Sequence, residues 1–294
     1  MRVDPHPLTT IANALEQNEQ TQNVLLQELA SGSAINAPSD NPVGAAQVLQ
    51  DTFQKSADTQ YGSNVANLQG QLQVASSTLS SVTTSLTQAI SLGTEGANGT
   101  MSATDRQSIA NQVSGIQSQL MGLANTQYQG NYLFGGTAST TPPYSADSSG
   151  VVSYNGNSGV NTAEISSGQF TPTNIPGSKL FAGGGTDMFK AMNDLVTALQ
   201  SGTGIPAATT EVQNAFNSVN TQTTFYGNTL SRLNSTAQFL TSEETQLTSN
   251  VTSVSGANMA QVASELDQTS VSAQALTGAA YQVNQLGLIT ILTG

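Results

Sequence analysis

The sequence predicts a mainly α fold, an elongated antiparallel helical rod with a terminal coiled coil and a small β-rich inserted domain. Three observations predict it. Apolar residues recur at alternating steps of three and four in several long stretches, the spacing of a helix with one apolar seam. This pattern stops at residues 137–185, where Gly, Ser, Thr, Asn and Pro alternate with short apolar runs. The seams nearest the two ends of the chain match each other, which favours their pairing.

Two stretches before the interruption predict a helical hairpin. The first seam consists of Val65, Leu68, Leu72, Ala75, Leu79, Val82, Leu86 and Ala89. It ends at a run of spaced glycines, Gly93, Gly96 and Gly99. The second helix is expected to begin at Thr104, with Gln107 completing a capping box, and its seam is Ile109, Val113, Ile116, Leu120 and Leu123. The short glycine-rich break predicts an antiparallel return.

A third and longer stretch predicts another helix of the rod. Its seam positions are Val212, Phe216, Val219, Thr223, Tyr226, Leu230, Leu233, Ala237, Leu240, Glu244, Leu247, Val251 and Val254. At a rise of about 1.5 Å per residue, this helix is expected to be about 65 Å long, which suits a rod better than a globule. The phase of the seam slips after Gly256, which predicts a domain boundary there.

The two ends of the chain carry helices that we expect to meet in an assembly. The amino-terminal seam runs from Leu8 to Leu29, and the carboxyl-terminal seam runs from Val262 to Val283. Because an isolated helix is marginal in water, we expect both helices to be poorly ordered alone and to pair into an inner coiled coil on assembly. The predicted self-assembly residues are Leu8, Ile11, Leu15, Leu25, Leu29, Val262, Leu266, Leu276, Val283 and Leu286.

Local signals place the remaining boundaries. Asn41 is expected to cap a helix with Pro42 at its first position, where the missing N–H costs nothing. Asp187 or Thr186 is expected to start the return helix after the β-rich segment. The predicted domains are therefore a terminal coiled coil (residues 1–42 and 258–294), a helical rod (43–136 and 186–257) and a β-rich insertion (137–185).

The composition excludes several classes of protein. Only 8% of the residues are charged, against about 25% in ordinary globular chains, and the formal net charge is −12. This sign is wrong for binding a nucleic-acid backbone or an anionic membrane surface. The chain has no cysteine, no apolar run long enough for a membrane span, and no signal-peptide pattern in residues 1–10. Export, if it occurs, is expected to use another route.

No group of residues predicts a catalytic, cofactor or metal site. His6 is the only histidine and lies between two prolines. The acidic pairs Glu243-Glu244 and Glu265 with Asp267 have no histidine beside them, so a solvated helix face explains them better than catalysis or metal binding. The glycines at 183–185 precede Thr186 without the lysine of a phosphate loop. We therefore expect no enzymatic activity and no cofactor.

Local motifs outside the seams carry a further signal. The run from Glu28 to Val43 contains Gly32, Ile35-Asn36 and a Pro-Ser-Asp-Asn-Pro-Val continuation. This run resembles the amino-terminal signature of the hook-associated protein 3 family, the junction relatives of flagellin, and its continuation favours the junction proteins over filament subunits. The run from Gly130 to Thr137 resembles the family's Tyr-Leu-Phe motif, and Gly227–Asn234 with Ala263–Asp267 resembles its return helix. Ser33-Ala34 departs from the family, whose members commonly carry Lys or Arg there.

This resemblance implies a flagellin-like fold and a structural role. It implies a secreted protein of the bacterial flagellum that assembles as a ring at the hook–filament junction after export through the type III apparatus. The implied partners are copies of the chain itself, a neighbouring hook-associated protein, flagellin and an export chaperone. The alternatives are a filament-forming flagellin, a secreted coiled-coil protein without a flagellar role, and an enzyme housed in the insertion.

Overall fold

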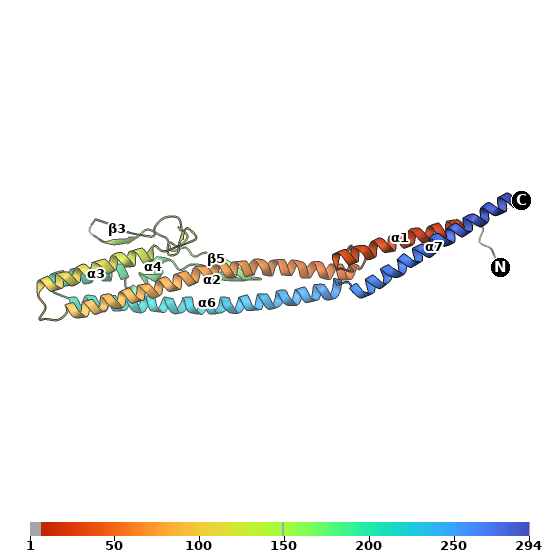
Figure 1. The fold of residues 1–294 in the computed structure, drawn as a ribbon. Helices are drawn as coiled ribbons and strands as arrows, with labels where there is room; N and C mark the ends of the chain where they lie inside the picture. Colours follow the sequence, from red (N-terminus) through yellow and green to blue (C-terminus); the bar gives the residue numbers. More distant parts are fainter. Residues whose placement is uncertain (1–6, 149, 294) are drawn as a thin grey trace. The chain divides into compact units, whose positions relative to one another are not determined.

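The computed structural model describes residues 7–148 and 150–293, which are mostly helical (Figure 1). The helices are α1 (Pro7–Ser31), α2 (Pro42–Gly96), α3 (Ala103–Ala124), α4 (Gly177–Leu180), α5 (Met188–Ser201), α6 (Ile205–Ser255) and α7 (Met259–Thr293), with a 3-10 turn at Gly183–Gly185. The strands are β1 (Gln127–Tyr128), β2 (Asn131–Tyr132), β3 (Tyr144–Ala146), β4 (Val152–Tyr154), β5 (Thr162–Ser166) and β6 (Gln169–Pro172), and they pair as three antiparallel hairpins. The predicted mainly α fold with a β-rich insertion is confirmed.

The described residues divide into two compact units. Unit 2 comprises Asp58–Ser242, and unit 1 comprises the described residues up to Ala57 and from Glu243 onward. The helices α2 and α6 each contribute residues to both units. The loops before α2 and α7 lie near residues 42 and 258, where the sequence predicts domain boundaries, whereas the two compact units divide after Ala57 and after Ser242. The predicted division into three domains stays a prediction.

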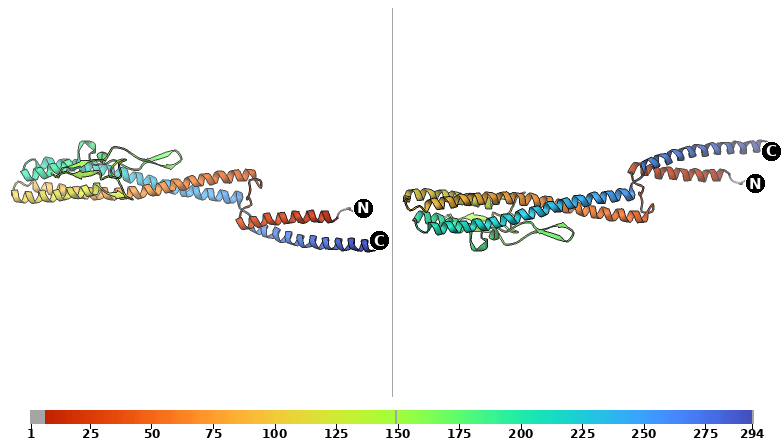
Figure 2. Two further views of the ribbon diagram at one scale, coloured as in Figure 1. Left: turned by 90° about the horizontal axis from the view of Figure 1, so that it is seen from above. Right: turned by 90° about the horizontal axis from the view of Figure 1, so that it is seen from below.

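In unit 2, the predicted seams form the core. The seam of α2 is buried from Val65 to Ala89, and α6 contributes the buried side chains of Val212, Tyr226 and Leu233. The two helices run side by side in opposite directions (Figures 1 and 2), and Gln69 Nε2 donates a 2.7 Å hydrogen bond to Asn234 Oδ1 between them. A second pair, α3 and α5, packs together over the same core. Apolar burial along these seams is the main stabilising contribution to unit 2.

The helix caps agree with the sequence at two of three positions. The backbone N–H of Gly44 donates to Asn41 Oδ1 at 2.9 Å, and α2 begins at Pro42 as predicted. Asp187 caps α5 by accepting hydrogen bonds from two backbone N–H groups. The predicted start of α3 at Thr104 is wrong, because Ser102 is the cap: its hydroxyl accepts from Asp105 N–H and donates to the Asp105 carboxylate.

The segment between α3 and α5 is anchored to the rod by an aromatic cluster. The rings of Phe134 and Phe181 meet edge to face at a centroid distance of 5.4 Å, and Tyr144 lies 5.0 Å from Phe189. The β1–β2 hairpin lies before residue 137, outside the predicted insertion, since strands of two residues leave no alternation to recognise. Its turn is formed by Gln129 (φ 50°) and Gly130 (φ 82°), the backbone of a type I′ turn.

Candidate assembly interface

The first and last helices of the described chain pair in unit 1. The helices α1 and α7 pack against each other and lie side by side in every view (Figure 2). Neither helix contributes a residue to the contiguous core of unit 2. The stability of this pair therefore depends on the seam between the two helices and on what else covers them.

The structure places the predicted self-assembly residues at different depths. Leu25 and Val262 are buried, with 5% and 4% of their surface exposed. A second group is half-buried along the α1–α7 seam: Ile11, Leu15, Leu266, Leu276 and Val283. Leu8 and Leu29 are exposed by 47% and 37%. The side chain of Leu286 lies outside the described residues. The seam of α7 is thus turned toward α1 along its described length.

A polar residue interrupts the apolar seam of α1. Asn18 is half-buried, and its Oδ1 atom has no hydrogen-bond partner among the described residues. A buried polar side chain at a seam position weakens a coiled coil but restricts its register, because only a matching donor satisfies it. Asn18 is therefore suited to selecting which helix packs against α1.

Backbone hydrogen bonds join the loop after α1 to the connection between α6 and α7. The helix α1 ends at Ser31, and the φ of 70° at the following Gly32 places that residue in the left-handed region. The backbone N–H of Ala34 then donates to the Ser255 carbonyl at 2.7 Å, and Ala257 N–H donates to the Gly32 carbonyl at 3.0 Å. These bonds join the loop after α1 to the break between α6 and α7. The segment that carries the family resemblance therefore connects α1 to the junction between α6 and α7, and we call it the brace.

The Pro-Ser-Asp-Asn-Pro part of this segment stabilises its own turn. One carboxylate oxygen of Asp40 accepts hydrogen bonds from the backbone N–H groups of Asn36 (3.0 Å) and Ala37 (2.7 Å). These backbone donors, Ala37 first, hold the pKa of Asp40 below its ordinary value. A Cβ atom at Gly44 would lie 2.6 Å from Asn41 Nδ2 and 2.8 Å from Ile35 Cδ1, so a side chain there would have to displace the ends of these two side chains.

Acid is expected to release this turn. Because the folded-state pKa of Asp40 is lowered, the charged form contributes stability above the ordinary value of 3.8, and this contribution is lost as the pH falls through the folded value. The amide NMR signals of Asn36 and Ala37 should titrate together with a midpoint below 3.8. The Asp40→Asn variant should lose this step, and a midpoint at or above 3.8 in the parent protein would contradict the assignment.

Sequence reasoning missed the apolar residues on the outer side of the pair. Val24 and Leu26 on α1 are exposed by 53% and 48%, and Val271 and Tyr281 on α7 by 65% and 66%. They lie off the three-four seam, so counting seam positions passes over them. The signal was their size: large apolar residues recur off the seam of helices that already have one apolar stripe. Each of these side chains is an apolar surface that a neighbouring copy would bury on assembly.

The charged residues of the α1–α7 pair are all acidic. The sequences of α1 and α7 contain five acids and no Lys or Arg: Glu16, Glu19, Glu28, Glu265 and Asp267. Charges on neighbouring copies would repel one another, but the Debye length of about 8 Å at physiological salt limits this repulsion to close approaches. Association of such surfaces is therefore expected to strengthen with salt.

The residues considered for chemistry do not form a site. His6 lies outside the described residues. In the described part of the chain, no group of three or more His, Asp or Glu side chains is placed to hold a metal ion. The glycines at 183–185 form a 3-10 turn before α5, as the sequence indicated. None of the described helices has both the length and the apolar character needed to cross a bilayer.

Comparisons with known proteins found matches over part of the chain. Residues 8–139 match the bacterial flagellin N-terminal helical region. Flagellar hook-associated protein 3 of Salmonella typhimurium is 29% identical over 156 residues, which are 53% of this chain and 48% of that protein. The chain thus spans about half the length of this curated relative.

Two solved structures have the same fold. A putative flagellar hook-associated protein from Vibrio parahaemolyticus is 23% identical, with a TM-score of 0.66 over 73% of this chain and 99% of that one. The flagellar junction protein FlgL from Legionella pneumophila is 13% identical, with a TM-score of 0.62 over 71% of this chain and 100% of that one. The resemblance to flagellin and hook-associated protein 3 that the sequence motifs predicted is confirmed.

Proposed function

We propose that this chain, whose residues 8–139 match the bacterial flagellin N-terminal helical region, is a structural subunit of the bacterial flagellum that joins hook to filament. The observation that carries the proposal is the position of this match. It covers α1, the brace after α1, and the helices α2 and α3. The likeness to hook-associated protein 3 supports the junction over the filament as the place of assembly.

The α1–α7 pair is the proposed assembly surface. Copies of the chain would pack the exposed side chains of Val271 and Tyr281 against helices of neighbouring subunits. Burying a large apolar side chain contributes about 1.5–3 kcal/mol, so a few such residues on each copy are enough to offset the ordering of the terminal helices. The unpartnered Oδ1 of Asn18 would then restrict which register is accepted. That the helices become ordered only on assembly stays a prediction.

The proposed partners follow from this place in the flagellum. They are copies of the chain in a junction ring, a neighbouring hook-associated protein on the hook side, and flagellin on the filament side. Secretion through the type III apparatus, guided by the amino terminus and an export chaperone, is part of the same proposal. A structural role needs no catalysis, and we infer that the chain is not an enzyme.

A filament-forming flagellin is the second candidate function. The match to the flagellin N-terminal helical region is common to both candidates, so it does not separate them. The Pro-Ser-Asp-Asn-Pro-Val run at residues 38–43 is the feature that favours the junction protein. Purified protein that grows into long polymers would favour flagellin, whereas a junction subunit should not extend indefinitely.

Immunogold electron microscopy on intact flagella tests the location. An epitope tag inserted after Ser148, an exposed residue between β3 and β4, should leave the helices undisturbed. Label confined to the hook end is the expected result. Label along the whole filament would make the protein a flagellin, and unlabelled flagella in cells that export the tagged protein would contradict any flagellar role.

A further inference from the structure

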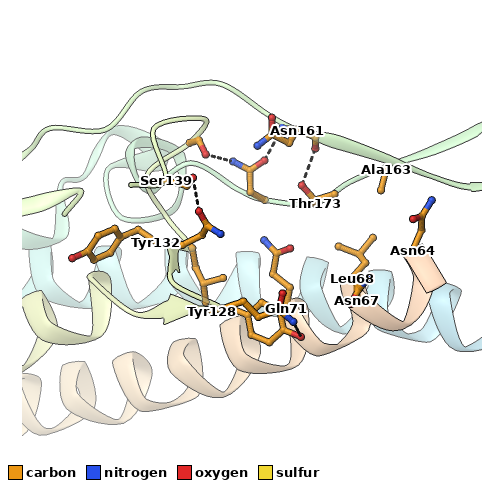
Figure 3. Close-up of a pocket in the computed structure, with 15 residues that line it drawn as sticks. Asn64, Asn67, Leu68, Gln71, Tyr128, Tyr132, Ser139, Asn161, Ala163 and Thr173 are labelled. Atoms are coloured by element: carbon orange, nitrogen blue, oxygen red, sulfur yellow. Dashed lines mark hydrogen bonds between the residues drawn. The ribbon is translucent and has the colours of Figure 1, made fainter. Parts of the chain in front are cut away.

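Unit 2 contains a cavity of about 440 Å³ that the assembly role does not use. Its walls come from α2, from the β1–β2 hairpin with the loop after it, and from the β5–β6 hairpin with its flanking residues (Figure 3). Figure 3 shows Leu68 and Gln71 on the α2 side and Asn161 and Thr173 opposite them. The volume is within the range of small-ligand sites in proteins.

The lining is polar but carries no charge. Seven of the lining residues are Asn or Gln, two are Tyr, and none is Asp, Glu, Lys, Arg or His. Each amide offers a donor and an acceptor about two ångströms apart at the end of one side chain. Such a surface complements a ligand that also presents paired donors and acceptors without a net charge.

The amides fall into two groups. Some hold the walls: Asn174 is 6% exposed, its Oδ1 accepts from Asn161 N–H at 2.8 Å, and its Nδ2 donates to the Gly136 and Gly159 carbonyls. Others have unused capacity: the side-chain amides of Asn67 and Gln71 make no hydrogen bond to any described residue. The first group fixes the shape of the cavity, and the second is available to a ligand.

Two features beside the cavity oppose local backbone preference. Gln129 is the one non-glycine residue with a positive φ in the described part of the chain, a conformation that side chains disfavour. Gly70 lies inside α2, where glycine weakens a helix, and a Cβ atom there would be 2.5 Å from the Tyr128 hydroxyl. The Gln129 conformation belongs to the type I′ turn of the β1–β2 hairpin, and the missing side chain at Gly70 leaves room for Tyr128 to lie against α2.

We propose that this cavity binds a neutral, polyhydroxylated ligand, a saccharide unit. Neighbouring hydroxyl groups of a sugar can each donate to and accept from the free amides of Asn67 and Gln71. An apolar ligand would bury these amides without partners, which costs affinity. An anionic sugar would be repelled by the net charge of −12 on the chain, and the cavity lining has no cationic side chain to pair with it. This inference is independent of where the protein sits in the flagellum.

A peptide strand fits the cavity less well than a sugar. Adding a strand requires a free row of backbone groups at a sheet edge. The carbonyl of Glu164 on β5 already accepts a 2.9 Å hydrogen bond from Asn64 Nδ2 on α2, and the Glu164 carboxylate accepts one from the Tyr61 hydroxyl. This backbone carbonyl of β5 is therefore already used by α2, whereas the side-chain amides of Asn67 and Gln71 are unpaired.

Saturation-transfer NMR on the full chain tests the proposal. The probes are neutral methyl glycosides and N-acetylglucosamine at millimolar concentration, with sialic acid and a short uncharged peptide for comparison. At least one neutral sugar is expected to receive saturation, while sialic acid and the peptide do not. The Gln71→Leu variant should weaken sugar binding about tenfold, the loss expected when one amide's hydrogen bonds are removed.

Matched variants separate binding from folding. Gln73 is an exposed glutamine on α2 outside the cavity, so Gln73→Leu should bind like the parent protein. Asn67→Ala, at an exposed position, should weaken binding without lowering the melting temperature, which covers the case in which Gln71→Leu disturbs packing. Absence of saturation for every neutral sugar, binding of the peptide or sialic acid instead, or equal losses in the Gln71 and Gln73 variants would overturn the proposal.

Discussion

The Leu266→Asp variant is expected to be absent from flagella although its unit 2 remains folded. Leu266 is half-buried in the seam between α7 and α1. A carboxylate there would lie among apolar side chains, and neither α1 nor α7 has a Lys or Arg to pair with it. The α1–α7 pair should then separate, because each helix alone is marginal in water. Unit 2 should persist, since its core contains no residue of α1 or α7.

The measurement is an immunoblot of sheared flagella from cells that carry only the variant. Gln268→Asp is the matched control, because Gln268 is exposed on the same helix and receives the same charge without entering the seam. The control should be incorporated like the parent protein. Circular dichroism should show one thermal transition for unit 2 in all three proteins. Normal incorporation of Leu266→Asp would contradict the assignment of the α1–α7 seam to assembly.

The Phe134→Ala variant is expected to lower the free energy of unfolding of unit 2 by about 3–5 kcal/mol. Phe134 is completely buried, and its ring meets Phe181 edge to face. Its carbonyl also accepts hydrogen bonds from Gly177 N–H (2.7 Å) and the Tyr154 hydroxyl (3.1 Å), so the backbone at this position joins three parts of the segment between α3 and α5. Removing the ring leaves a cavity where these parts meet the rod, and tight packing there cannot collapse to fill it.

Urea unfolding of the purified chain measures this loss. Phe170→Ala is the control, because Phe170 on β6 is exposed by 63%. A surface substitution of this kind should change the free energy of unfolding by no more than about 0.5 kcal/mol. Equal stabilities for the two variants would show that the aromatic cluster does not anchor the insertion. If Phe134→Ala unfolds only the segment between α3 and α5 and leaves the stability of the helical rod unchanged, the two parts unfold separately.

The helical part of this protein was predictable from the sequence because its signals are local. The three-four spacing from Val65 to Ala89 describes one face of one helix, and a face of that width needs a partner wherever it lies. The caps at Asn41 and Asp187 act on backbone groups within three residues of themselves. The segment from Glu28 to Val43 was recognised by its resemblance to a known family. Its physical role, which is to hydrogen-bond the loop after α1 to the connection between α6 and α7, is evident only in the structure.

Only the tertiary structure decided the features that depend on distant segments meeting. The cavity in unit 2 combines α2 near Gln71, the hairpin at Tyr128 and the strands near Asn161, and no local pattern relates these three segments. The burial of Phe134 and the exposure of Tyr281 likewise follow from which helix lies beside which, although both are large aromatic residues in the sequence. Periodicity determines that a helix has an apolar face, because backbone geometry repeats along the chain. It does not determine what covers that face, because that depends on packing between residues that are far apart in sequence.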